Sequence, residues 1–229
     1  MNAQLIYNMF ILLLEIIYSL LIVVIIDYLV KNNKLSRRTG RKLVHLLMGG
    51  LILFWFLYKS AYAEVFFSIV PLIFIAIIVF ANLGKGSHKK NVARLTWTGN
   101  IREAVKGPLF FFFIFILITA IGFKSLPGVV ALCAMVFGDG IAPFLGSMRK
   151  NKKSGNKSIE GAFGVFIGTL ISSFIIYVIF FQGAAIYPYV LLIIAGVFAS
   201  IIEFFTPSSY DNLTVPIAVF ILLFILQFV

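Results

Sequence analysis

The chain has 229 residues, of which 62% are hydrophobic and only 12% charged, and its formal net charge is +11. A mean hydropathy of +1.08 excludes a water-soluble globular domain of this size, because such a domain needs a far more polar surface. The composition therefore indicates an all-α polytopic integral membrane protein. The length leaves no room for a separate aqueous domain, so we expect a single transmembrane domain over residues 1–229.

Apolar runs long enough to cross a bilayer recur along the chain, and each span needs roughly 20 residues. They predict about eight transmembrane helices (7–9), with boundaries good to a few residues. The first run lacks a basic segment before it and a small-residue cleavage site after it, which favours a retained span over a signal peptide. The predicted spans are residues 5–30, 43–58, 62–83, 108–123, 126–146, 162–181, 186–205 and 213–229.

Basic residues gather in three of the gaps between these spans. Seventeen of the nineteen lysines and arginines lie near residues 31–42, 84–107 and 147–161. These gaps alternate with gaps poor in basic residues, so the positive-inside rule places them together in the cytoplasm, with both termini outside. The gap at about 206–212 then faces the cytoplasm as well. The basic gaps suit contact with anionic membrane lipids, and no nucleic-acid binding is expected because the chain carries no nucleic-acid module.

Four acidic residues lie within or at the ends of predicted spans, where each costs on the order of 2.5 to 3.5 kcal/mol unless it is paired or faces a cavity. No motif surrounds Glu15 or Asp27, so pairing with a neighbouring helical residue is a sufficient explanation for both. Asp139 differs because Gly138 and Gly140 flank it and leave the backbone open to close approach. Asp139 is therefore a candidate functional residue.

The segment after Asp139 carries further groups that suit a phosphate and a metal ion. Mg²⁺ prefers carboxylate and phosphate oxygens, so Asp139 with Glu160 could hold an ion on a polyphosphate. Lys157 offers a positive charge, and Ser158 with the first amides of the sixth span can donate to phosphate oxygens. The spacing is not that of a Walker A loop. Gly164 and Gly168 form a small-xxx-small pair that is typical of helix packing.

Four separated motifs then give a resemblance that covers most of the chain. They are R-K-L-V-H at 41–45, G-D-G-I-A-P-F-L-G at 138–146, K-S-I-E-G at 157–161 and E-F-F-T-P-S-S-Y-D-N-L-T-V-P at 203–216. Their order resembles that of the membrane-embedded dolichol kinase and phytol kinase family. The resemblance implies a CTP-dependent lipid-alcohol kinase that transfers the γ-phosphate of CTP to an isoprenoid alcohol, such as a polyprenol or dolichol, phytol or geranylgeraniol. It also implies Mg²⁺ as cofactor and a nucleotide site at the cytoplasmic face, in the plasma membrane if the source is prokaryotic.

Site roles follow from this resemblance, position by position. The expected catalytic residues are Asp139 and either Asp211 or His45, the last two as groups that orient or deprotonate the alcohol. The expected metal ligands are Asp139, Glu160 and Glu203. Pro143 stands where many relatives carry an acid, which leaves the use of one or two metal ions open. The expected nucleotide-binding residues are Gly138, Gly140, Gly146, Lys157, Ser158, Gly161, Arg41, Lys42 and Asn212.

Two other functions remain open on the sequence. A cytidylyltransferase that makes a CDP-lipid would also use CTP, Mg²⁺ and a membrane substrate, although the long basic and histidine-containing motif of that family is missing here. A transporter or scaffold would also carry intramembrane acids and glycine-interrupted spans. The polar clusters gather at one face, which favours the kinase.

Overall fold

The computed structural model describes residues 3–59, 62–83, 105–146, 157–181, 186–207 and 210–228. All regular structure within these ranges is helical, which confirms the predicted all-α class. Two shorter apolar helices, Gly107–Gly122 and Asp211–Leu226, accompany six that are long and apolar enough to cross a membrane. These six are Ala3–Lys31, Arg37–Leu57, Ala63–Leu83, Leu126–Gly146, Ile159–Phe181 and Ile186–Phe205. The predicted polytopic architecture is thus confirmed. Most of the basic gaps 84–107 and 147–161 lie outside the described residues.

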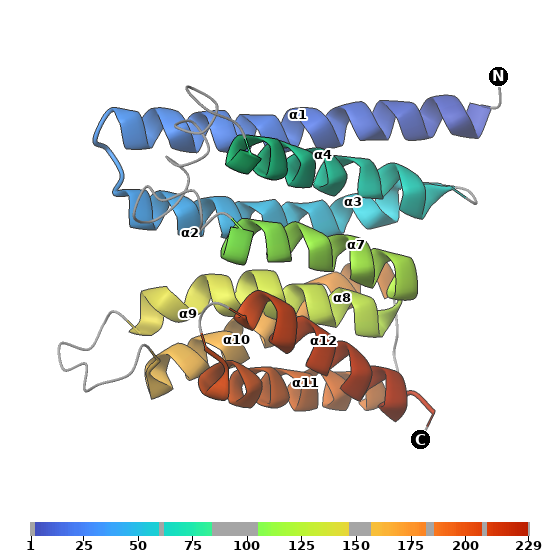
Figure 1. The fold of residues 1–229 in the computed structure, drawn as a ribbon. Coiled ribbons are helices and arrows are strands. Elements are labelled where there is room, and N and C mark those ends of the chain that lie inside the picture. The colour runs from blue at the N-terminus through green and yellow to red at the C-terminus, as the bar shows by residue number, and fades with distance from the viewer. Residues whose placement is uncertain are drawn as a thin grey trace. The chain divides into compact units, whose positions relative to one another are not determined.

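The chain forms two compact units, Met1–Ala120 and Ile121–Val229, and the prediction of a single membrane domain stays a prediction. The first unit contains the helices drawn in blue to green in Figure 1, and the last two residues of α7 belong to the second unit. The elements are α1 (Ala3–Lys31), α2 (Arg37–Leu47), the 3₁₀ turn η1 (Met48–Gly50), α3 (Leu51–Leu57), α4 (Ala63–Leu83), the π-helical η2 (Val105–Leu109) and α7 (Phe110–Gly122).

Both acidic residues of α1, together with Asn8, have partners inside the first unit, as expected for acids without a motif. The Tyr58 hydroxyl donates to Glu15 Oε2 at 2.6 Å, and both residues are fully buried. Asn8 exchanges hydrogen bonds with the backbone of Lys59, at 2.6 and 3.0 Å. Asp27 forms an ion pair with Lys31, one turn further along α1. The interpretation of Glu15 and Asp27 as paired residues is confirmed.

A 3₁₀ turn interrupts the second predicted span where α1 approaches it. The Tyr18 hydroxyl donates to the Leu47 carbonyl oxygen at 2.5 Å, just before η1. A Cβ atom on Gly50 would come within 2.1 Å of that hydroxyl oxygen, so only glycine admits the contact.

The second unit contains the helices drawn in yellow to red in Figure 1. The fifth predicted span is one continuous stretch in which a π-helical segment, η3, separates α8 from α9 immediately before Asp139. Such segments inside α-helices occur frequently at functional sites. The elements are α8 (Leu126–Cys133), η3 (Ala134–Gly138), α9 (Asp139–Gly146), α10 (Ile159–Ile176), the π-helical η4 (Tyr177–Phe181), α11 (Ile186–Phe205) and α12 (Asp211–Leu226).

Glycines set the contact of α10 with η3 and α9. A Cβ atom on Gly168 would lie 2.4 Å from the Phe137 carbonyl oxygen, and one on Gly164 would lie 2.9 Å from Ala142 Cα. The two backbones therefore touch without side chains between them, which confirms the packing role predicted for the glycine pair. This close contact fixes the position of Asp139 relative to the start of α10.

Candidate active site

Three carboxylates from three elements of the second unit meet at one place. Asp139 is the first residue of α9, Glu203 lies in the last turn of α11, and Asp211 is the first residue of α12. Each offers an oxygen, and these atoms all lie within 4.8 Å of one another. They form the only group of at least three His, Cys, Asp or Glu side chains with metal-binding spacing in the described ranges. We call them the carboxylate cluster.

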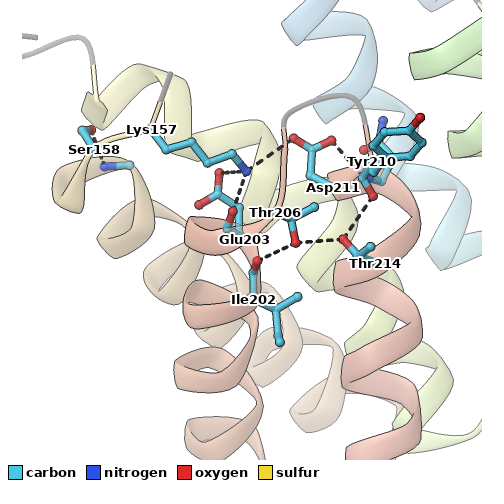
Figure 2. Close-up of polar contacts among 10 residues, drawn as sticks. Lys157, Ser158, Ile202, Glu203, Thr206, Tyr210, Asp211 and Thr214 are labelled. Carbon is cyan, nitrogen blue, oxygen red and sulfur yellow. Dashed lines mark hydrogen bonds and ion pairs between the residues drawn. The ribbon is translucent and has the colours of Figure 1, made fainter. Parts of the chain in front are cut away.

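Lys157 approaches this cluster from the segment just before α10. Figure 2 shows its ammonium group between the end of α11 and the start of α12. Lys157 Nζ lies 2.7 Å from Glu203 Oε1 and 3.7 Å from Asp211 Oδ2, and it donates to the Glu203 backbone oxygen at 2.6 Å. One lysine therefore ties the segment before α10 to both helices that follow.

The charges of these four side chains do not cancel. Three carboxylates and one ammonium group carry a formal charge of −2, and the Glu203 and Asp211 side chains are only 8% and 10% exposed. Buried charge is costly unless it is paired. Glu203 Oε2 is buried and has no hydrogen-bond partner among the residues that the structure describes. Carboxylate oxygens are the ligands that Mg²⁺ prefers, so the donor set fits a divalent cation.

Hydrogen bonds at the turn between α11 and α12 fix the positions of Glu203 and Asp211 relative to each other. The Thr206 hydroxyl donates to the Ile202 carbonyl oxygen at 2.7 Å, and the Thr214 hydroxyl lies 3.1 Å from that of Thr206, as Figure 2 shows. The Asn212 amide donates to Asp211 Oδ1 at 2.9 Å, which orients the carboxylate at the helix start. The contact between Thr206 and Thr214 links the end of α11 to the first turn of α12.

Ser158 begins α10 as its N-cap. Its Oγ accepts from the Gly161 amide at 3.1 Å, and a Cβ atom on Gly146 would lie 3.0 Å from the same oxygen. Accepting this bond does not use the hydroxyl proton of Ser158, so the predicted phosphate contact is compatible with capping. The start of α10 also presents backbone amides, which suit an anion.

Other predicted site residues of the second unit have packing positions. A Cβ atom on Gly138 would lie 2.7 Å from Thr169 Oγ1, and Gly140 and Gly161 are buried. Glu160 lies in the first turn of α10 and is not part of the carboxylate cluster. Their predicted roles with nucleotide and metal stay predictions.

The predicted site residues of the first unit lie on α2. Arg41 and His45 contact the same neighbouring segment, as their i, i+4 spacing indicates. A Cβ atom on Gly107 would lie 2.4 Å from Arg41 Nη2, and the rings of His45 and Phe111 have centroids 4.5 Å apart. Arg41, Lys42 and His45 are all half-buried. Their predicted participation in the site stays a prediction.

Sequence reasoning assigned Asp211 to proton transfer and did not group it with the metal ligands. The structure places its carboxylate beside those of Asp139 and Glu203. The available signal in the sequence was an acidic residue at the start of the last apolar helix, eight residues after Glu203 in the fourth motif.

Comparison with known proteins gives relatives over most of the chain. The Oryza sativa subsp. japonica protein named "Probable phytol kinase 2, chloroplastic" is 30% identical over 208 residues, 85% of this chain and 68% of that protein. "Phytol kinase 1, chloroplastic" of Arabidopsis thaliana is 31% identical over 158 residues, 66% of this chain and 52% of that protein. "Farnesol kinase, chloroplastic" of Arabidopsis thaliana is 27% identical over 199 residues, 81% of this chain and 64% of that protein.

No protein-family model and no solved structure matches the chain. The relatives agree with the resemblance seen in the four sequence motifs, and the match with the rice protein covers more than two thirds of both chains. The chain belongs to the phytol kinase family.

Proposed function

We propose that the protein is a lipid-alcohol kinase that transfers the γ-phosphate of CTP to the hydroxyl group of an isoprenoid alcohol at the cytoplasmic face of a membrane. The observation that carries the proposal is the buried carboxylate cluster with Lys157, found in a membrane protein of the phytol kinase family. The acceptor is of the polyprenol or dolichol, phytol or geranylgeraniol class.

Phosphoryl transfer requires in-line placement, neutralisation of charge and a proton acceptor, with little other protein chemistry. Asp139, Glu203 and Asp211 are the residues that would hold Mg²⁺, which when bound supplies positive charge to the phosphate oxygens. The hydroxyl of Ser158 and the first amides of α10 would bind phosphate oxygens of the nucleotide. These groups lie in the second unit, directly after Lys157, whose ammonium group contacts the carboxylate cluster.

The proton of the acceptor alcohol needs a base. Asp211 is one candidate in a state where its carboxylate is not a metal ligand, because the Asn212 backbone amide orients that carboxylate within the cluster. His45 is the other, on the half-buried face of α2 next to Phe111. The sequence resemblance also assigns Arg41 and Lys42 to nucleotide binding, and that assignment stays a prediction.

The depth of the carboxylates in the helices suits a lipid substrate. Glu203 lies in the last turn of one apolar helix, and Asp211 is the first residue of the next. Exposed apolar side chains of α11 and α12, among them Ile201, Phe205 and Phe224, suit contact with lipid tails. An alcohol whose chain lies among lipid tails would present its hydroxyl near these helix ends, where a water-soluble nucleotide would also reach it.

The proposal is tested with purified protein in detergent, Mg²⁺, γ-labelled CTP or ATP, and a panel of phytol, geranylgeraniol, dolichol and diacylglycerol. Label is expected in an isoprenoid product with CTP as donor, together with release of CDP. Release of pyrophosphate would instead indicate a cytidylyltransferase. A protein that labels no lipid with either donor would overturn the proposal.

A further inference from the structure

The carboxylates of the cluster come from two pairs of helices in the second unit. Asp139 lies on α9, whose backbone touches that of α10 where a Cβ atom on Gly164 would lie 2.9 Å from Ala142 Cα. Glu203 and Asp211 lie at the facing ends of α11 and α12. The cluster is therefore complete only while the end of the α11–α12 pair stays beside the α9–α10 pair.

Lys157 connects the two pairs at this place. It lies just before Ser158, the N-cap of α10, and its side chain is only 13% exposed. Its ammonium group meets three oxygens of the other pair, which are Glu203 Oε1 at 2.7 Å, the Glu203 backbone oxygen at 2.6 Å and Asp211 Oδ2 at 3.7 Å. An ammonium group has three N–H donors, and two of these serve Glu203. Most of the donor capacity of Lys157 is thus used within the protein.

The bond to the Glu203 backbone oxygen distinguishes this arrangement from a simple ion pair. That oxygen lies in the last turn of α11, where carbonyl groups lack the full set of helical partners. A lysine at such a helix end satisfies a carbonyl oxygen and interacts favourably with the helix dipole. Lys157 therefore fixes the end of α11 itself as well as the carboxylate that this helix end carries.

We propose that Lys157 is a positioning residue, which promotes phosphoryl transfer by holding Glu203 and Asp211 beside Asp139 and not by binding a phosphate of the nucleotide. This inference rests on the proposed function and deepens it, because it assigns the lysine to assembly of the metal-binding carboxylates. Without its ammonium group, the end of α11 loses its bond to the segment before α10, and two nearly buried carboxylates lose the cation that they share. The three carboxylates then no longer converge.

Binding of Mn²⁺ tests the inference without any reaction. Purified full-length protein in detergent is titrated with Mn²⁺ alone, with no nucleotide or lipid, and bound Mn²⁺ is measured by electron paramagnetic resonance. The wild type is expected to bind Mn²⁺, and Lys157→Met is expected to bind it about 10-fold more weakly or worse, as for the loss of other groups that orient metal ligands. Lys31→Met, which removes a lysine paired with Asp27 on α1, is the matched control and should keep the wild-type affinity.

The sign of the change separates the two roles of the lysine. If Lys157 served only a phosphate, its removal would take a positive charge away from the bound cation and leave the affinity for Mn²⁺ unchanged or higher. Either result, or a wild-type protein that binds no Mn²⁺, would overturn the inference. If Lys157→Met does not fold, Lys157→Gln is judged by the same criteria.

Kinetics give a second readout. At saturating Mg²⁺, Lys157→Met is expected to lower kcat while the KM for CTP stays within about 3-fold of the wild-type value, and the variant should need more Mg²⁺ for half its maximal rate. An unchanged kcat, or a KM for CTP raised about 10-fold, would contradict the positioning role. Transfer of label from CTP to lipid by the wild type is measured separately, so failure of the inference is distinguishable from failure of the proposed function.

Discussion

Tyr58 and Glu15 form a hydrogen bond in the interior of the first unit, and the loss of its donor has a measurable cost. Glu15 Oε1 already makes no hydrogen bond within the described residues, so Tyr58→Phe leaves both carboxyl oxygens without one. We expect Tyr58→Phe to lower the free energy of unfolding by about 1 kcal/mol, measured by unfolding in mixed SDS micelles. Tyr28→Phe, at an exposed position, is the control. Equal stability of the two variants would contradict the role given to this bond.

Asp139 is the residue on which the candidate site depends most directly. Asp139→Asn keeps the size of the side chain but removes one of three negative charges from the cluster. Transfer of label from CTP to lipid is expected to fall by about 100-fold or more. Asp27→Asn alters an acid that is paired with Lys31, and should keep wild-type turnover. Full activity of a folded Asp139→Asn protein would refute the assigned site.

Local patterns singled out residues such as Asp139 that lie in the carboxylate cluster, but they did not predict which residues contact one another. Asp139 was singled out by its flanking glycines, and Asp27 was expected to be paired. Lys157 contacts Glu203, which lies 46 positions further along the chain. Rules based on helical periodicity or motif spacing do not predict contacts over such a sequence separation. Lys157 was therefore predicted to meet a phosphate, whereas the structure places its ammonium group on carboxylates.

At the scale of elements, each predicted apolar run coincides with helical structure. Hydropathy predicts membrane helices well because the backbone must satisfy its own hydrogen bonds inside a bilayer. The 3₁₀ turn η1 and the π-helical segment η3 were not predicted. At η1 the Tyr18 hydroxyl donates to the Leu47 carbonyl oxygen, a contact between distant residues that hydropathy does not encode. Glycine is a weak signal for an interruption of a membrane helix, because glycines such as Gly164 and Gly168 also serve helix packing.

The contact of α10 with η3 predicts a strong effect from a small substitution. Gly168→Ala places a Cβ atom 2.4 Å from a backbone oxygen, whereas Gly196→Ala meets the Phe166 ring at 3.1 Å, where a side chain can move. We expect Gly168→Ala to destabilise the protein by about 1 to 3 kcal/mol, and Gly196→Ala by clearly less. Thermal unfolding in detergent measures both. The reverse order would contradict the described packing.

At the scale of the whole molecule, the distribution of basic residues predicts that the gap 147–161 faces the cytoplasm. A membrane-impermeant maleimide applied to intact cells tests this, because the native Cys133 is buried. Gln182→Cys, in the short gap between the sixth and seventh predicted spans, should be labelled in intact cells. Asn151→Cys should react only after lysis. Labelling of Asn151→Cys in intact cells would reverse the proposed orientation of the site.

The position of Glu203 and Asp211 on either side of the short turn after α11 determines when the carboxylate cluster can form during biosynthesis. Ribosomes deliver a chain from its N-terminus, so Asp139 and Lys157 enter the membrane well before the two later carboxylates. The carboxylates that pair with Lys157 are synthesised later, as part of the α11–α12 hairpin. The carboxylate cluster therefore forms only after this hairpin has been synthesised, and the proposed metal site is incomplete in shorter nascent chains.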